Sequence, residues 1–259
     1  MMAIRIHNLW KSFQKQDVLK GLNLHVIKGE TLVILGRSGV GKSVLLKHIL
    51  GITKPDAGYV EVDGLRISEL SERNYYKNIR NMGMLFQGAA LFDSMTVGEN
   101  IAFYLQEHGD PHTKEKLSTS EIQKRVRKSL EMVNLSGTED VMPSELSGGM
   151  RKRAALARLI IYRPQIILYD EPTTGLDSIT SKQINEMMVQ TQRNLQATSV
   201  VVTHDIQSAL FVGNRLAFFD QKDMIFSILK KEEFIAGHFP EHPLIRSFFD
   251  NAFPKKQNL

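Results

Sequence analysis

The 259-residue sequence contains no cysteine, which excludes a disulfide framework and any metal site built from thiolates. This absence fits a reducing compartment, and the cytoplasm is the expected location. No run of residues approaches the roughly 18 consecutive apolar residues of a membrane span. The first ten residues, MMAIRIHNLW, also lack the apolar core of a signal peptide. The sequence therefore predicts a chain that does not itself cross a bilayer.

Charge of either sign is not strongly in excess, because 33 basic residues face 28 acidic ones, giving a net charge of +5 and a pI near 9.3. Such an excess fits an anionic partner or an ordinary solvated surface. The basic residues are scattered, and no array of aromatic residues suited to stacking on bases accompanies them. We therefore expect no nucleic-acid partner. The 42% of hydrophobic residues is enough to bury a core.

Apolar and polar residues alternate in the first part of the chain, which predicts antiparallel strands with one buried face. The inward positions are Ile4 and Ile6, then Leu22, Leu24 and Val26. This pattern predicts an antiparallel β-region that precedes the first chemical motif.

A glycine-rich loop follows the continuous apolar run at residues 31–35, which is typical of a buried parallel strand. The loop fits the pattern G-x-x-x-x-G-K-[ST] of a P-loop, whose backbone N–H groups and following helix attract phosphate. Its residues are Gly36, Arg37, Ser38, Gly39, Val40, Gly41, Lys42 and Ser43. We expect Lys42 to reach the β- and γ-phosphates of ATP and the Ser43 hydroxyl to ligate Mg²⁺.

A second buried strand, predicted at residues 166–169, runs directly into Asp170 and Glu171. In P-loop ATPases an acidic residue in this place holds Mg²⁺, so we expect that role for Asp170. Glu171 would then polarise the attacking water. An alternative is that Glu171 only caps a helix that follows Pro172.

The segment between these motifs narrows the class of ATPase. Residues 146–150, LSGGM, precede a helix predicted at residues 151–162, which Pro164 ends. LSGG resembles the signature of the ABC ATPase family, and the resemblance implies a homodimer. Ser147, Gly148 and Gly149 would then meet the γ-phosphate held by the partner's P-loop. The alternative is that these three residues form only a tight turn and a helix cap.

The resemblance extends over about residues 4 to 230 and implies four further site residues. Phe13 would stack on adenine, with Trp10 as a possible substitute. Gln87 would contact Mg²⁺ and water and would move with the state of the nucleotide. Asp177 would pack against the other protomer, and His204 would sense the γ-phosphate.

The same resemblance implies an α/β fold, that of a P-loop NTPase of the ABC ATPase type. It would have a mostly parallel core sheet, an N-terminal antiparallel β-subdomain and an inserted helical subdomain. We expect one ATP-binding cassette at residues 1–235, with the insertion at about 88–160, and a C-terminal extension at 236–259. Within the insertion, Ser118 to Glu121 predicts the capped start of a helix that reaches Leu130 and carries a solvated charged face.

Three local features resemble the branch that serves Mce-type lipid-transport systems, the Mla and TGD group. Residues 86–97 read FQGAALFDSMTV, Met150 follows LSGG where most ABC ATPases have glutamine, and residues 242–249 read HPLIRSFF. The last stretch either helps to hold a dimer or forms an amphipathic helix docked on its own domain. Tyr169 and the pair at residues 173–174 depart from this branch and look more like generic importers.

The resemblance as a whole implies an ATP-hydrolysing transporter subunit that uses ATP and Mg²⁺. It would energise lipid transport together with an integral membrane permease and a Mce-domain lipid-binding protein. The expected location is peripheral, on the cytoplasmic face of the inner or cell membrane. The alternatives are the ATPase of another ABC importer and a non-transport ATPase of the cell-division type.

Overall fold

The structure is a computed structural model that describes residues 1–14, 16–111 and 113–254, without the side chains of residues 77 and 78. The chain divides into two compact units. Unit 1 comprises Met1–Lys77 and Thr198–Leu259, and unit 2 comprises Asn78–Ala197. The last five residues of the predicted C-terminal extension, 255–259, lie outside the described residues.

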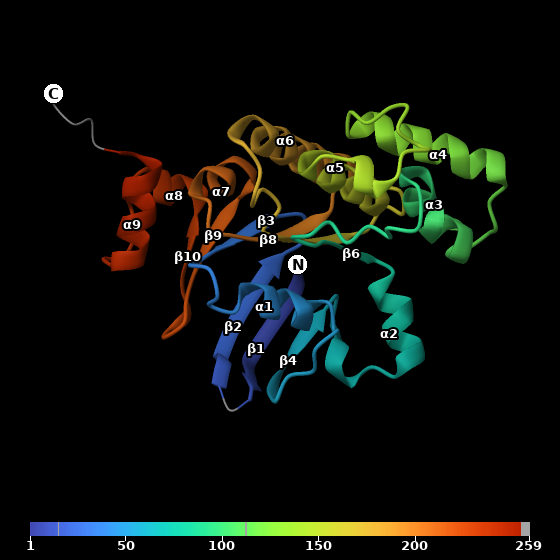
Figure 1. The fold of residues 1–259 in the computed structure, drawn as a ribbon. Helices are drawn as coiled ribbons and strands as arrows, with labels where there is room; N and C mark the ends of the chain where they lie inside the picture. Colours follow the sequence, from blue (N-terminus) through green and yellow to red (C-terminus); the bar gives the residue numbers. More distant parts are fainter. Residues whose placement is uncertain (15, 112, 255–259) are drawn as a thin grey trace, which may run out of the picture. The chain divides into compact units, whose positions relative to one another are not determined.

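Unit 1 contains a four-stranded antiparallel sheet with the order β2-β1-β4-β5 (Figure 1). Its strands are β1 (Met2–Phe13), β2 (Gln16–Ile27), β4 (Ala57–Val62) and β5 (Leu65–Arg66). The alternation seen in the sequence matches the burial of β1 and β2, whose five predicted inward residues are all buried. The predicted antiparallel β-region is therefore confirmed.

Unit 1 also contains strands in the order β10-β9-β3-β8, of which β3, β8 and β9 run parallel and β10 is antiparallel to β9. Their bounds are β3 (Thr31–Leu35), β8 (Thr198–Thr203), β9 (Arg215–Asp220) and β10 (Met224–Lys230). All five residues of β3 are buried, as its continuous apolar run predicts. Because Leu35 is in register with Thr203, β3 and β8 end side by side.

The helices of unit 1 connect or cover these strands. They include α1 (Lys42–Ile49) after β3, α7 (Ile206–Val212) after β8, then α8 (Lys231–Ile235) and α9 (Pro243–Ala252). A short 3₁₀ helix, Ile67–Glu69, and α2 (Glu72–Ile79) follow β5.

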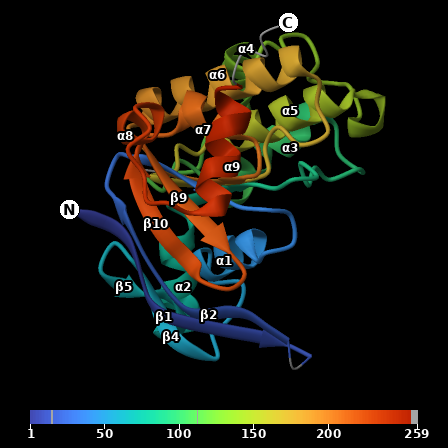
Figure 2. The same ribbon diagram turned by 90° about the vertical axis from the view of Figure 1, so that its left-hand side faces the viewer.

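Helix α9 lies beside β9 and β10 (Figure 2). The ring of Phe248 lies 6.2 Å from that of Phe218 in β9, and His242 stacks on Phe226 of β10 at 3.9 Å. Of the two expectations for this segment, docking on its own domain is what the structure shows, because its apolar face is covered within unit 1. A role in dimerisation stays a prediction.

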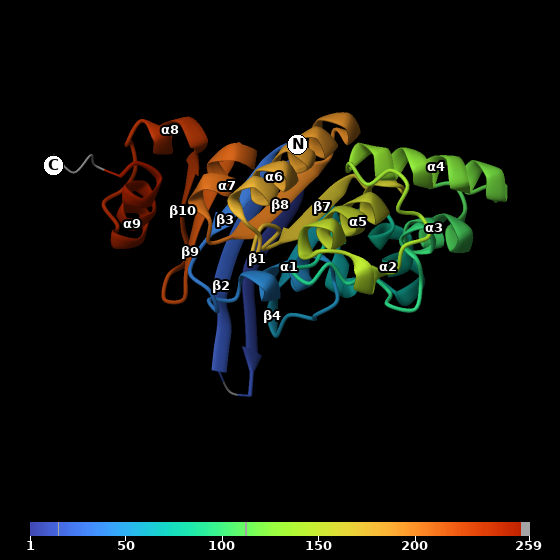
Figure 3. The same cartoon turned by 45° about the horizontal axis from the view of Figure 1, so that its top comes forward.

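Among its described residues, unit 2 combines two parallel strands with four α-helices that lie wholly within it. The strands are β6 (Met82–Leu85) and β7 (Ile166–Asp170). The helices are α3 (Val97–His108), α4 (Thr119–Met132), α5 (Gly148–Ile160) and α6 (Ser178–Leu195), with a 3₁₀ helix at Pro143–Glu145. Helices α3, α4 and α5 pack together, within the residues predicted for the helical subdomain (Figure 3). Parallel strands, a separate antiparallel sheet and helices together confirm the α/β fold class.

The capped helix predicted near residue 118 is present as α4. The Ser118 Oγ accepts a hydrogen bond from the Glu121 N–H at 3.2 Å, as in an N-cap. Lys124 and Lys128 are exposed, so the charged face is solvated, whereas Leu130 on the opposite face is buried. The helix thus packs through one face and exposes the other.

Helix α5 begins three residues before its predicted start at residue 151 and ends at Ile160, not at residue 162. Two glycines are poor helix formers, which favoured a later start. The Ser147 Oγ, however, accepts a hydrogen bond from the Met150 N–H at 3.3 Å. This cap fixes the helix start ahead of both glycines. Among the described residues, no helix has the length and apolar character that crossing a bilayer requires.

Candidate active site

The P-loop connects β3 to α1 and curls around the side chain of Lys42. The Lys42 Nζ donates hydrogen bonds to the carbonyl oxygens of Gly36 and Arg37, at 2.8 and 2.9 Å. Gly39 and Gly41 adopt φ values of 83° and 108°, in the left-handed region that glycine enters without a steric cost. Gly41 has no side chain to cap α1, so backbone N–H groups at this helix start suit an anion.

Close packing requires glycine at two P-loop positions. A Cβ on Gly41 would lie 2.9 Å from the Val18 Cγ1 of β2, so the antiparallel sheet supports this side of the loop. A Cβ on Gly36 would lie 2.5 Å from the carbonyl oxygen of Phe219 in β9. The loop is therefore held closely on both sides, which preorganises its backbone for a ligand.

His204 lies in unit 1, at the same sheet edge as the P-loop. The Gly36 N–H donates to the carbonyl of Thr203 at 3.4 Å, so the loops that follow β3 and β8 start side by side. His204 is exposed, and the next residue, Asp205, caps α7 by accepting a hydrogen bond from the Gln207 N–H at 2.9 Å. The structure thus brings His204 and the P-loop together.

The two aromatic candidates for adenine stacking differ in their surroundings. The Trp10 ring packs over Gly21, whose hypothetical Cβ would lie 3.3 Å from the indole, and its Nε1 donates to the Asn8 Oδ1 at 3.1 Å. Phe13 is 45% exposed at the end of β1, with the Lys11 ammonium 5.4 Å from its ring centre. Trp10 is itself 40% exposed, so the two rings differ little in accessibility and differ mainly in that the Trp10 indole is held by a hydrogen bond.

In unit 2, Asp170 ends β7 and Glu171 follows it, and both are buried. Leu85 of β6 is in register with Tyr169 of β7, so Gln87 emerges at the same edge of this strand pair. Gln87 itself is exposed. The structure thus brings Gln87 and the two carboxylates together at the ends of neighbouring strands.

Glu171 starts a tight turn at residues 171–174, which we call the Glu171 turn. Glu171 has a φ of 46°, the Thr174 N–H donates to its carbonyl at 3.2 Å, and the Thr174 Oγ1 donates to its Oε2 at 3.0 Å. The alternative that Glu171 caps a following helix is wrong, because α6 begins only at Ser178 and its cap is Asp177. The carboxylate of Glu171 is held by its own turn.

The signature and Asp177 lie next to each other. A Cβ on Gly149 would lie 2.6 Å from the Thr180 Cγ2, so the start of α5 packs tightly on the start of α6. The Thr180 hydroxyl donates to the Asp177 Oδ2 at 2.6 Å and, together with backbone N–H groups, lowers the pKa of that carboxyl. Ser147 and Gly148 are exposed. Ser147 does cap a helix, as the alternative expected, and that helix start remains accessible to a ligand.

The predicted site residues divide between the two units. Unit 1 holds Phe13, the P-loop and His204, and unit 2 holds Gln87, the signature, the two carboxylates and Asp177. The described residues contain no group of three or more acidic or histidine side chains able to hold a metal ion. Ser43 and Asp170 nevertheless offer hard oxygen ligands, which suit Mg²⁺ when substrate phosphates supply further ligands. Each unit thus carries an oxygen ligand of the kind that Mg²⁺ binds.

Sequence patterns missed two residues that hold the Glu171 turn: Thr174, its last residue, and Lys152. Lys152 is buried on α5, and its Nζ donates to the carbonyls of Thr174 and Glu171. The sequence could have indicated that Lys152 is buried, because it lies four positions before Leu156, on the same face of the helix, and Leu156 is buried. Thr174 carries no such signal.

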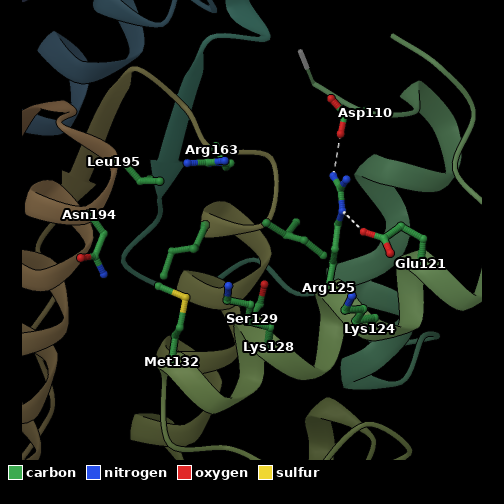
Figure 4. A pocket seen from close by; sticks show the side chains of 12 residues that line it. Asp110, Glu121, Lys124, Arg125, Lys128, Ser129, Met132, Arg163, Asn194 and Leu195 are labelled. Atoms are coloured by element: carbon green, nitrogen blue, oxygen red, sulfur yellow. Dashed lines mark hydrogen bonds and ion pairs between the residues drawn. The ribbon is translucent and has the colours of Figure 1, made fainter. Parts of the chain in front are cut away.

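A cavity of about 760 Å³ lies elsewhere in unit 2, beside α4 and the ends of α5 and α6 (Figure 4). Arg125 crosses its edge and pairs with Asp110 at 2.7 Å and with Glu121 at 3.0 Å. None of the predicted nucleotide-binding residues lines this cavity. Its ion pairs fix the loop after α3 onto α4.

Comparisons with known proteins agree with this set of motifs. The family model described as "ABC transporter" matches residues 19–174. The chain is 37% identical over 249 residues to a probable ribonucleotide transport ATP-binding protein mkl of Mycobacterium leprae, covering 96% of this chain and 69% of that protein. It is 42% identical over 213 residues to the intermembrane phospholipid transport system ATP-binding protein MlaF of Haemophilus influenzae, covering 82% of this chain and 78% of that protein.

Other similar proteins are named for other cargoes or lineages. They include a methionine importer ATPase of Carboxydothermus hydrogenoformans, an aliphatic sulfonate importer ATPase of Agrobacterium fabrum, and the Arabidopsis thaliana protein TRIGALACTOSYLDIACYLGLYCEROL 3, at 35%, 37% and 35% identity.

Among solved structures, the dimeric ATP-binding cassette MJ0796 in a post-hydrolysis state with ADP and Pi superposes with a TM-score of 0.80 at 32% identity, covering 88% of this chain and 98% of that one. The sequence match, the P-loop and the fold agree with one another. This chain therefore belongs to the ABC transporter family and is one of its ATP-binding, ATP-hydrolysing subunits.

Proposed function

We propose that this subunit energises the transport of a phospholipid or related lipid. The observation that carries the proposal is the 42% identity to the phospholipid-transport protein MlaF, which extends over 78% of that protein. The methionine and sulfonate importer ATPases are 35% and 37% identical. Met150 after the signature and the FQGAALF stretch at residues 86–92 support the same branch.

The partners in this proposal are a second copy of the chain, an integral membrane permease and a Mce-type lipid-binding protein. The subunit would then lie peripherally on the cytoplasmic face of the membrane. The exposed start of α5 supports pairing of two copies, because a signature that faces outward can reach a nucleotide held by another chain. Lipid movement itself would take place in the permease.

Hydrolysis in this proposal depends on positioning, since phosphoryl transfer asks little covalent chemistry of the protein. Phe13 stacks on adenine, and the P-loop N–H groups with Lys42 hold the phosphates. Glu171 accepts a hydrogen bond from the attacking water and polarises it. His204 contacts the γ-phosphate from the neighbouring strand end.

The remaining residues serve the metal and the partner. Ser43, Asp170 and Gln87 would hold Mg²⁺, whose charge offsets that of the phosphates. Ser147, Gly148 and Gly149 approach the partner's γ-phosphate, and Asp177 packs against the partner protomer. Gln87 follows the nucleotide state and passes that change to the permease.

A second candidate function is import of another small cargo, and the relatives named for ribonucleotide, methionine and sulfonate transport favour it. Such importers need the same ATPase chemistry, so the site does not separate the two functions. The membrane partners of the two kinds of transporter differ, and they do separate the two functions.

The test is to purify the intact complex from detergent-solubilised membranes through a tag on this chain and to identify its members by mass spectrometry. Lys42→Ala serves as a matched sample, because it should weaken ATP binding while leaving the surface unchanged. We expect a multispanning permease, a Mce-domain protein and bound phospholipid to be recovered with both forms. Recovery of a permease with a periplasmic or extracellular binding protein for a small solute would overturn the lipid proposal.

A further inference from the structure

A buried cation, Lys152, occupies the first part of helix α5, three residues after the last glycine of the signature. Lys152 is only 6% exposed. Burying an ammonium costs free energy, and this burial lowers the pKa of Lys152, against the opposing effect of the Glu171 charge. An apolar side chain would fill the same space without that cost. The hydrogen bonds of Lys152 must therefore offset the cost of burying its charge.

Its bonding partners are backbone carbonyls at both ends of the Glu171 turn. The Nζ donates to the carbonyl of Thr174 at 2.8 Å and, over a longer 3.4 Å, to the carbonyl of Glu171. The Thr174 N–H closes the turn onto the Glu171 carbonyl at 3.2 Å. One ammonium thus satisfies acceptors at the start and the end of a four-residue turn.

The turn needs such support because Glu171 adopts a φ of 46°, where a side chain with a Cβ is strained. A non-glycine residue in the left-handed region is strained and persists only where the surrounding structure holds it. Without an external anchor, relaxation of this strain would swing the Glu171 carboxylate away from its present direction. Hydrogen bonds from Lys152 oppose that relaxation.

We infer that Lys152 is a positioning residue that holds the Glu171 turn in its reactive conformation and ties it to the signature helix. The inference rests on the proposed role of Glu171 in polarising water. Because Ser147 and Lys152 lie on the same short length of α5, a shift of the signature on meeting the partner's nucleotide is transmitted to Glu171. One rigid contact thereby links the two nucleotide sites of a dimer.

The test compares Lys152→Met, which keeps length but removes every donor, with Lys152→Gln, which keeps two N–H donors without the charge. ATP turnover and equilibrium ATP binding are measured on the full chain, alongside thermal unfolding. Lys152→Met should lower kcat about tenfold to a hundredfold with little change in KM or ATP affinity, since misplacing a reacting group by about 1 Å has that effect. Lys152→Gln should recover most of the rate, because amide N–H groups can bond the same carbonyls.

Lys128→Met is the matched control, because Lys128 is an exposed lysine on α4 away from the Glu171 turn, and it should leave kcat unchanged. Glu171→Gln is measured in parallel. If Glu171→Gln abolishes turnover while folded Lys152→Met keeps a normal kcat, the inference is wrong and the role of Glu171 stands. If Glu171→Gln retains turnover, the proposed role of Glu171 fails first. A loss in Lys152→Gln as large as in Lys152→Met would also overturn the inference.

Discussion

Trp10 and Phe13, the two aromatic side chains near the end of β1, differ in their contacts more than in their residue type. Trp10 is fixed by its hydrogen bond to Asn8 and its packing over Gly21, so its indole is part of the hairpin. Phe13 contacts the Lys11 ammonium and otherwise presents its ring outward. An exposed ring at the end of β1 suits stacking on a base.

Replacement of Phe13 by alanine should raise the Kd for ATP about fivefold to a hundredfold, because stacking of a base on an aromatic ring contributes about 1–3 kcal/mol. Trp10→Ala should lower the unfolding temperature and leave the Kd for ATP unchanged. Isothermal titration with ATP, and with inorganic triphosphate as a probe that lacks adenine, measures both effects. A weaker Kd in Trp10→Ala with a normal one in Phe13→Ala would assign adenine stacking to Trp10.

At the residue scale, the sequence was informative where a fixed spacing of residue types carries the chemistry. The P-loop lysine and serine, the carboxylates after a buried strand and the signature could all be found in this way, and they stand as predictions of role. Lys152 and Thr174 were not found, because what they bond is backbone carbonyls and a neighbouring side chain, which leave no spacing in the sequence.

Helix α1, which carries the P-loop lysine at its start, contains a buried histidine near its end. His48 is 2% exposed, and its Nδ1 lies 2.8 Å from the Val44 carbonyl, which requires the proton on Nδ1. Its Nε2 has no hydrogen-bond partner among the described residues. Burial lowers the pKa of His48 below its usual 6.5, so folding disfavours protonation of this ring.

Stability should therefore fall in mild acid. The unfolded chain binds a proton at His48 as pH drops below 6.5, whereas the folded chain resists doing so until its lower pKa is reached. The neutral, buried His48 therefore contributes its full share of stability above pH 6.5. As the pH drops from 6.5 toward the lower pKa of the folded state, the free energy of unfolding falls by up to about 1.4 kcal/mol per pH unit. Chemical denaturation of the nucleotide-free chain at pH 7.5 and 5.5 measures this loss.

The variant His48→Asn keeps a donor near the Nδ1 position but does not titrate, so its loss of stability between the two pH values should be smaller. His238→Asn, at an exposed histidine outside the helices, should behave as the unaltered chain does. An equal loss of stability in all three proteins would show that the pKa of His48 is the same in the folded and the unfolded state, and would contradict this prediction.

At the element scale, strands were predictable because buried parallel strands are continuous apolar runs, as in residues 31–35 and 166–169. Helix boundaries were less predictable than strands. The start of α5 depends on whether a serine cap outweighs two glycines, and the cap prevails. The Glu171 turn was not predicted, because a left-handed glutamate is held by contacts from α5 that lie outside the local sequence.

At the scale of the whole molecule, each of the two units carries part of the predicted nucleotide site. In unit 2, the start of α5 is exposed and packs on the cap of α6, so the signature and Asp177 form one outward-facing surface. In the proposed dimer a second chain would complete this surface, and one solved structure similar to this chain is a dimer. Whether α9 docks on its own unit or reaches a partner was open in the sequence, because the same apolar face suits both. The structure covers that face with Phe218 and Phe226.

The variant Glu171→Gln tests whether this chain hydrolyses ATP through Glu171 in a nucleotide-dependent dimer. Turnover, ATP affinity and mass in solution by light scattering are measured with and without MgATP. We expect normal ATP affinity, turnover reduced about a hundredfold or more, as for loss of a general base, and a dimer that persists in MgATP. Turnover at the rate of the unaltered chain would contradict this expectation.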